Sequence, residues 1–201
     1  TLPQVAVPNG LAVGGLQVAP GAVPGSALWQ GAALPSQTAS GGQTTVTVNQ
    51  TAPQAILNWQ SFNVGAQTDV VFNQQGNSRW VALNRVTGNV GPSQILGNIR
   101  ADGQVLLINQ SGIIFGGASQ VNVGSLVAST LNITDQQFKT GLLNRSPFDN
   151  AGNLKAPIFG NSSGPTGNVI VEAGAVIVTA PPASVTTGGG NVFLLGADRK
   201  S

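Results

Sequence analysis

The stretch Gly167-Asn168-Val169-Ile170-Val171 recurs as Gly190-Asn191-Val192-Phe193-Leu194, an offset of 190 − 167 = 23 residues. In each copy, glycine and asparagine suit a turn, and the three apolar residues that follow suit a short strand. Repeats of roughly 20 residues and upward are typical of solenoids, in which every coil adds strands to the same sheets, so 23 residues is a plausible length for one coil. The repetition therefore favours a β-solenoid over other all-β folds.

Short strands separated by turn residues extend outward from this repetition. Residues 44–49 (TTVTVN) are β-branched with period-two alternation, which is a good strand signal. Further strands are predicted at residues 55–59, 69–72, 80–84, 104–108, 112–115, 120–123 and 126–129. Only 7% of the residues are charged, and asparagine is frequent. Both features suit stacked coils, because like charges placed above one another repel whereas asparagines can form ladders.

Two segments interrupt the rhythm of strands. Residues 1–42 carry five prolines among glycines and predict an irregular N-terminal cap. Residues 135–166 predict an excursion from the main body, such as a hairpin. A helical turn opens it and runs to about Leu143, with Thr134 as N-cap and Gln137 reaching back to it. We therefore expect one domain, residues 1–201, with coils at 43–134 and 167–198.

The composition argues against several classes of function. The chain has no His, Cys or Tyr and only six acidic residues, so it lacks the usual proton shuttles and nucleophiles. We expect no catalytic residues, no cofactor and no metal. The net charge is +2 and the basic residues are scattered, which argues against a nucleic-acid partner. No apolar run approaches the ~20 residues of a membrane-spanning helix, so we expect no membrane insertion.

Several sequence blocks together identify a family. They are residues 56–65 (ILNWQSFNVG), 81–88 (VALNRVTG), 93–97 (SQILG), 103–109 (GQVLLIN), 120–131 (QVNVGSLVASTL) and 189–197 (GGNVFLLGA). In this order and at these separations they resemble the N-terminal secretion domain of two-partner-secretion exoproteins. This is the filamentous-haemagglutinin type, also called the haemagglutination-activity domain. The resemblance covers residues 44–198 and is poor before them.

The family's signature motif, Asn-Pro-Asn-Gly-Ile, has a counterpart at residues 109–113. Asn109, Gly112 and Ile113 keep the motif, while Gln110 replaces proline and Ser111 replaces asparagine. Physically the motif is a turn between stacked strands, where Asn and Gly tolerate left-handed geometry. The motif is therefore either a turn that the fold needs or a signal that the transporter reads. Secondary candidates for recognition or for core packing are Asn58, Trp59, Phe62, Asn63, Asn84 and Arg85.

The resemblance implies a right-handed parallel β-helix with an N-terminal cap and extra-helical hairpins. It also implies a module that heads a large exoprotein, often an adhesin, haemolysin or host-factor binder. In the family, this module addresses the unfolded chain to an outer-membrane pore with periplasmic polypeptide-binding domains, then nucleates the β-helix of the remainder. We therefore expect a monomeric module, secreted or at the cell surface after periplasmic transit. The full-length protein would contact host-cell or matrix glycans.

Other interpretations stay open at this point. A glycan-binding module would use Trp29, Trp59 and Trp80 as stacking platforms, although a strand tryptophan more often packs in a core or cap. A polysaccharide lyase or hydrolase would need clustered carboxylates, and the acidic residues lie far apart in sequence.

The basic residues and the first strand also allow two interpretations each. Arg85 and Arg100 are either grips for an acidic partner or surface charges satisfied within the chain. Residues 43–49 are either the first coil or a strand that pairs with the transporter by β-augmentation.

Overall fold

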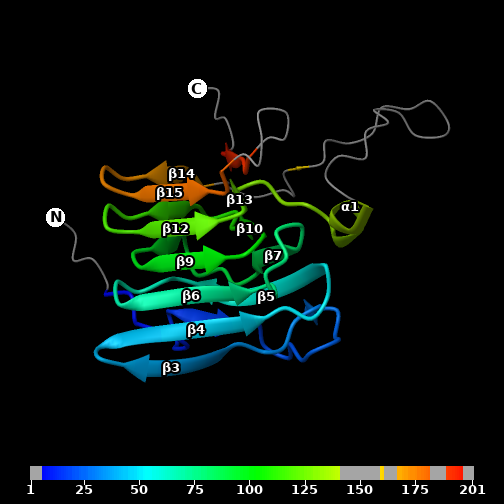
Figure 1. Ribbon diagram of the computed structural model, residues 1–201, viewed down its shortest axis with the longest axis horizontal. Helices are drawn as coiled ribbons and strands as arrows, with labels where there is room; N and C mark the ends of the chain where they lie inside the picture. The colour runs from blue at the N-terminus through cyan, green and yellow to red at the C-terminus, as the bar shows by residue number, and fades with distance from the viewer. Residues whose placement is uncertain (1–5, 141–158, 161–166, 182–188, 197–201) are drawn as a thin grey trace.

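A computed structural model describes residues 6–140, 159–160, 167–181 and 189–196. They form a right-handed parallel β-helix in which each coil visits three sheets in turn (Figure 1). The first sheet holds β5 (Gln54–Phe62), β7 (Val81–Val86), β10 (Gln104–Ile108), β13 (Ser125–Ser129) and β16 (Val192–Leu195). The second sheet holds β8 (Ser93–Ile95), β11 (Ile113–Phe115) and β14 (Val169–Val171). The predicted fold class is confirmed.

The third sheet forms the front of the molecule in Figure 1. It holds β3 (Ser36–Ser40), β4 (Gln43–Asn49), β6 (Thr68–Asn73), β9 (Asn98–Ala101), β12 (Gln120–Val123) and β15 (Val176–Thr179). All its pairings are parallel except the antiparallel hairpin of β3 and β4. Two neighbouring asparagines of this sheet pair as a ladder would require, because Asn73 Nδ2 donates to Asn49 Oδ1 across 2.9 Å.

The 23-residue repetition does not mark one coil, and this interpretation of it was wrong. β14 pairs with β11 in the second sheet, whereas β16 pairs with β13 in the first. Glycine and asparagine precede a strand at two different corners of the solenoid, which produces the likeness. The coil length was nevertheless right elsewhere: Gln104 lies beside Val81 and Ser125, at offsets of 104 − 81 = 23 and 125 − 104 = 21 residues.

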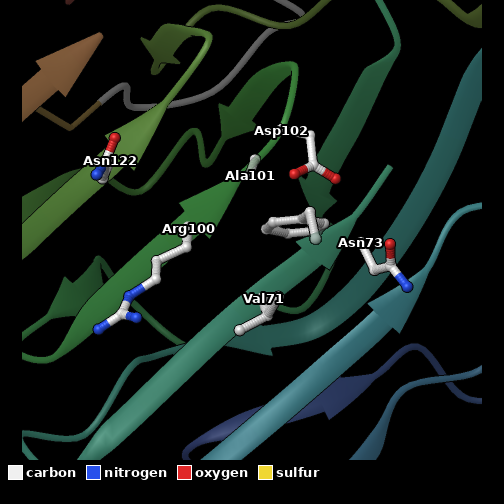
Figure 2. Close-up of a pocket in the computed structure, with 7 residues that line it drawn as sticks. Val71, Asn73, Arg100, Ala101, Asp102 and Asn122 are labelled. Atoms are coloured by element: carbon white, nitrogen blue, oxygen red, sulfur yellow. The ribbon is translucent and has the colours of Figure 1, made fainter. Parts of the chain in front are cut away.

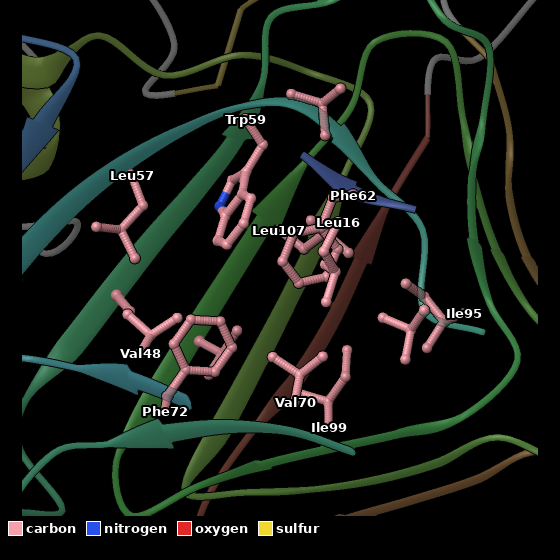
Figure 3. Packing of buried hydrophobic residues seen from close by; sticks show 14 of the residues in the cluster. Leu16, Val48, Leu57, Trp59, Phe62, Val70, Phe72, Ile95, Ile99 and Leu107 are labelled. Atoms are coloured by element: carbon pink, nitrogen blue, oxygen red, sulfur yellow. The ribbon is translucent and has the colours of Figure 1, made fainter. Parts of the chain in front are cut away.

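The N-terminal end of the solenoid is closed by antiparallel strands. β1 (Leu16–Val18) and β2 (Trp29–Gln30) both pair with β5. Trp29 lies edge-on to Trp59 at a centroid distance of 5.1 Å, and Trp59 lies edge-on to Phe62 at 5.2 Å. These rings and the aliphatic side chains of the inward faces fill the solenoid (Figure 3). The aromatic cluster therefore seals this end of the core.

The first sheet is buried on both faces along β5, β7, β10 and β13. Leu57, Leu107 and their neighbours face the interior, while Ile56, Leu83, Leu106, Ile108 and Val127 form a second cluster on the outer face. Ile133, Phe138 and Phe159 cover that outer cluster. Burial on both faces explains why β10 reads as a continuous apolar run rather than an alternating one.

Phe138 comes from α1 (Asp135–Thr140), which lies at the right of the solenoid in Figure 1. The predicted capping box is confirmed: Gln137 N donates to Thr134 Oγ1 and Thr134 N donates to Gln137 Oε1. The expected helix end near Leu143 and most of the predicted excursion fall outside the described residues. Within the described ranges, no helix is long and apolar enough to cross a membrane.

Candidate functional site

Two blocks that the sequence singled out meet at one pocket. Ile108 pairs with Arg85 in the first sheet, so the segments that follow β10 and β7 lie side by side. Together with Asn132 they line a pocket of about 390 Å³, formed by Arg85, Val86, Thr87, Gly88, Asn89, Ile108, Asn109, Gln110, Ser111 and Asn132. The strand register of the solenoid therefore brings the signature turn and the end of β7 into a single site.

Asn109 organises the turn from a buried position. Its Nδ2 donates to the carbonyl oxygen of Gly91 at 3.1 Å and to Ser93 Oγ at 3.0 Å. Its Oδ1 accepts from Ser111 N at 2.9 Å, and its carbonyl oxygen accepts from Gly112 N at 3.0 Å. Asparagine suits this position because its side chain mimics a backbone turn while it bridges two coils.

The rest of the turn is stacked between the coils on either side. Ser93 N donates to the Gly112 carbonyl at 3.0 Å, and Gly167 N donates to the Gln110 carbonyl at 2.6 Å. Gly112 has φ +124°, and a Cβ there would lie 3.1 Å from the Asn168 carbonyl. Only glycine adopts that conformation without strain.

Burial divides the signature motif into two parts. Asn109, Gly112 and Ile113, which keep the family motif, are buried. Gln110 and Ser111, which depart from it, are half-buried and line the pocket. The residues that keep the motif therefore form the interior of the turn, and the residues that depart from it form its accessible surface.

Arg85 joins the end of β7 to the segment that covers the outer face. Its NH2 donates to the Ile133 carbonyl at 2.7 Å, its Nε to Asn132 Oδ1 at 3.1 Å, and its NH1 to Asn58 Oδ1 at 3.3 Å. Its NH1 also lies 2.8 Å from Asp135 Oδ1. The Arg85 side chain is 14% exposed, so the guanidinium is satisfied within the chain.

The other secondary candidates make three further sets of contacts. Asn84 Oδ1 accepts from Trp59 Nε1 at 3.0 Å inside the solenoid, and Phe62 lies edge-on to the same indole. Asn58 Nδ2 donates to the Leu28 carbonyl in the cap at 3.0 Å. Asn63 connects the Gly14 carbonyl to Gln94 N. The structure thus supports core and corner packing for these residues, and their part in recognition stays a prediction.

The structure argues against tryptophans as sugar platforms and against β-augmentation by residues 43–49. Trp29 and Trp59 are fully buried, so neither offers a platform for a sugar, and Trp80 is half-buried. The strand β4 pairs with β3 on one side and β6 on the other, so it has no free edge for β-augmentation. The edge strands of that sheet are β3 and β15.

Asn132 and Asp135 are site residues that the sequence interpretation missed. They lie 47 and 50 positions after Arg85, and only their contacts with its guanidinium reveal them. Across the described part of the chain, no group of three His, Cys, Asp or Glu side chains is placed to hold a metal ion.

Comparison with known proteins places this architecture. A family model described as the TPS secretion domain matches residues 23–200. Two heme/hemopexin-binding proteins of Haemophilus influenzae, one from strain Rd, are each 38% identical over 88 residues. That match covers 44% of this chain but only 10% and 9% of those proteins, so this chain spans a small part of their length.

A solved structure gives a similar result. The crystal structure of the HMW1 secretion domain from Haemophilus influenzae aligns with a TM-score of 0.54 at 26% identity. The alignment covers 82% of this chain and 38% of the HMW1 chain. The family match over most of the sequence, and the shared β-helix, lead to one conclusion: this chain belongs to the TPS (two-partner secretion) secretion-domain family.

Proposed function

We propose that this chain addresses a larger exoprotein to an outer-membrane two-partner-secretion pore, whose periplasmic polypeptide-binding domains recognise it. The observation that carries the proposal is the TPS secretion-domain match over residues 23–200. The parent protein is then exported to the cell surface or beyond after periplasmic transit. The module acts as a monomer and by binding rather than catalysis, without a cofactor.

The pocket beside the signature turn is the proposed recognition surface. It combines the exposed parts of Gln110 and Ser111 with the loop that follows β7. The loop packs tightly against β5 of the preceding coil, because a Cβ on Gly88 would collide with the Gln60 carbonyl. A surface built on such fixed corners has a defined shape, which lowers the entropic cost of binding a partner.

The open end of the solenoid supports a second role, nucleation of the β-helix that follows. The last strands of the three sheets, β14, β15 and β16, carry apolar side chains that are 42% to 52% exposed: Ile170, Val171, Val176, Val178, Val192, Phe193 and Leu194. The other end is capped by antiparallel strands. An added parallel coil would bury these side chains and pair these edges, which is the driving force for stacking further coils.

We assign the effector function to the remainder of the exoprotein. Relatives in the comparison carry names that refer to heme and hemopexin binding, and this chain spans about a tenth of their length. Adhesion, or binding of a host factor or of matrix glycans, would then belong to the parent protein and not to the signature pocket.

Deletion of residues 23–200 from the parent protein tests the proposal. We expect the deletion to abolish surface and culture-supernatant levels of the parent when its pore is present, while the periplasmic level before degradation is maintained. A parent that still reaches the surface at its normal level would overturn the assignment.

Within the turn, secretion of Asn109→Ala should fall more than that of Gln110→Ala or Ser111→Ala, because Asn109 holds the corner. Equal secretion defects for the three variants would contradict this ranking.

A further inference from the structure

The edge strand β3, at the capped end of the third sheet, has an open side. Residues 41–42, which join it to β4, are glycines with φ +59° and +82°, as in a two-residue type I′ hairpin. Ser40 and Gln43 therefore exchange hydrogen bonds, and every second residue of β3 continues this pattern. The amide and carbonyl groups of Gln37 and Ala39 point the other way, where no described residue pairs with them.

This strand lacks the features that usually protect a sheet edge. Edge strands commonly carry a charge, a proline or a bulge. β3 reads SQTAS over residues 36–40, is fully exposed and pairs with β4 without a register shift. Moreover, residues 1–68 contain no Asp, Glu, Lys or Arg, although the whole chain has 6 acidic and 8 basic residues. The edge is therefore open to a further strand.

Charged side chains lie elsewhere on the solenoid. Asp69 is on β6, which β4 separates from β3. Arg100 and Asp102 are on β9 and directly after it (Figure 2). In the cap, Lys139 Nζ donates to Gln30 Oε1 of β2, which belongs to the first sheet. A neutral edge has nothing that attracts a strongly charged partner, and it meets its own copy without bringing like charges together.

The outward side chains of β3 are complementary to a second copy of the same strand. Gln37 lies opposite Val46, which is buried in the core, so Gln37 faces inward. Thr38 therefore faces outward, with Ser36 two residues before it and Ser40 two residues after it. This row of hydroxyls reads the same in both directions. In an antiparallel pair of two copies, Thr38 faces Thr38 and Ser36 faces Ser40, and such hydroxyl pairs stabilise a sheet.

The same register satisfies the open backbone groups. With Thr38 on a two-fold axis, Gln37 of each copy lies opposite Ala39 of the other. Residues in that position of an antiparallel pair exchange both of their hydrogen bonds. No outward amide or carbonyl group of Gln37 or Ala39 then stays unpaired.

An apolar groove lies beside β3 at the same end of the molecule. It has a volume of about 520 Å³, and its lining includes Leu11, Val13, Leu34 and Pro35, the last two leading into β3. Leu11 N donates to Gln37 Oε1 at 2.6 Å, so the groove and the strand are in contact. Val13 is 85% exposed and Leu34 is 41% exposed. Two copies that meet cap to cap would withdraw this apolar surface from water, which favours association.

We infer that the folded domain pairs with a second copy of itself, cap to cap, through antiparallel pairing of β3 and burial of the apolar groove. The third sheets of the two copies then form one continuous sheet. The open ends of the two solenoids point away from each other, so each stays free for the coils that follow. Pairing concerns the folded domain after export, whereas a single chain addresses the pore, so this inference does not rest on the proposed pore recognition.

Sedimentation velocity of the purified chain at about 1 to 200 µM tests this pairing, and we expect a monomer–dimer equilibrium in that range. Thr38→Lys and Thr38→Glu should each weaken the dimer at least about fivefold, because like charges then meet at the axis. An equimolar mixture of these two variants should restore the dimer, because opposite charges then meet. Thr45→Lys places the same charge on the same face of β4 and should change the dissociation constant by less than about twofold.

Two further variants separate the backbone contact from the rest of the molecule. Ala39→Pro removes a donor that faces the second copy and no hydrogen bond within the chain, so it should weaken the dimer at least about tenfold. Phe193→Asn changes an exposed side chain at the open end and should leave the dimer unchanged. Tryptophan fluorescence of each variant checks that the fold is retained, since Trp29 and Trp59 are buried.

Three outcomes would overturn the inference. The first is a chain that stays monomeric over the whole concentration range. The second is a mixture of Thr38→Lys and Thr38→Glu that pairs no better than either variant alone. The third is a dimer that Phe193→Asn abolishes while Thr38→Lys and Ala39→Pro retain it, because the contact would then lie at the open end.

Discussion

Replacement of Asn109 by alanine is the sharpest single test of how the signature turn is built. The substitution removes three side-chain hydrogen bonds, to the Gly91 carbonyl, to Ser93 Oγ and from Ser111 N. Each such bond contributes about 1 kcal/mol net, and a buried group that loses its partner costs about 1 to 3 kcal/mol. Because Ser111 is half-buried, water can replace the third bond in part. We therefore expect Asn109→Ala to lower the free energy of unfolding by about 2 to 4 kcal/mol.

Urea unfolding followed by tryptophan fluorescence measures this loss, since the buried indoles of Trp29 and Trp59 report on the core. Ser111→Ala is the matched control in the same turn and should change the free energy by no more than about 0.5 kcal/mol. The double variant with Ser93→Ala should show a coupling of about 1 kcal/mol, because the two side chains share a hydrogen bond. An Asn109→Ala protein within about 0.5 kcal/mol of wild type would refute the proposed role of this side chain.

Three further predictions concern other parts of the molecule. Gln110→Pro, which restores the proline of the family motif, should raise the free energy of unfolding by about 0.5 to 1 kcal/mol, because proline presets the turn; destabilisation in urea would show that the turn does not fit proline. Arg85→Ala should lower the free energy of unfolding by about 2 to 4 kcal/mol, since it leaves Asp135 and the Ile133 carbonyl without their partner. Protease cleavage at residues 131–140 should accelerate, and an unchanged cleavage rate would show that Arg85 does not hold this segment against the solenoid. Phe193→Asn should leave the stability of the chain within about 0.5 kcal/mol, because the side chain is 52% exposed; a chain extended by its next coils should be destabilised by this change, and equal effects in both chains would argue against stacking at the open end.

Sequence patterns were sufficient for the fold because each coil repeats a local strand-and-corner pattern. Residues 104–108 read as a strand from their apolar run alone, and the structure has β10 there. Their burial on two faces was not predictable, because the outer cover comes from Ile133, Phe138 and Phe159, which lie in and beside an excursion. A continuous apolar run has no periodicity that distinguishes its two faces.

The candidate site was only partly visible in the sequence. Asn109 and Gly112 stand out as turn residues, and Arg85 stands out within a family block. That Asn109 and Arg85 line one pocket follows from the register that pairs Ile108 with Arg85. The Arg85–Asp135 pair spans 50 positions, and no local pattern predicts a contact at that separation. The repetition of Gly-Asn misled for a related reason, since the same corner chemistry serves two different sheets.

The central claim is that this chain addresses a protein to an outer-membrane pore, and transplantation tests it most directly. Residues 1–201 are fused ahead of the β-helical remainder of an exoprotein that lacks its own secretion domain, and the fusion is expressed with and without the pore encoded beside the parent gene. Surface protease accessibility of the passenger is then measured in intact cells. We expect the passenger at the surface only when both the domain and the pore are present. A passenger that stays in the periplasm with both present, or reaches the surface without the pore, would contradict the claim.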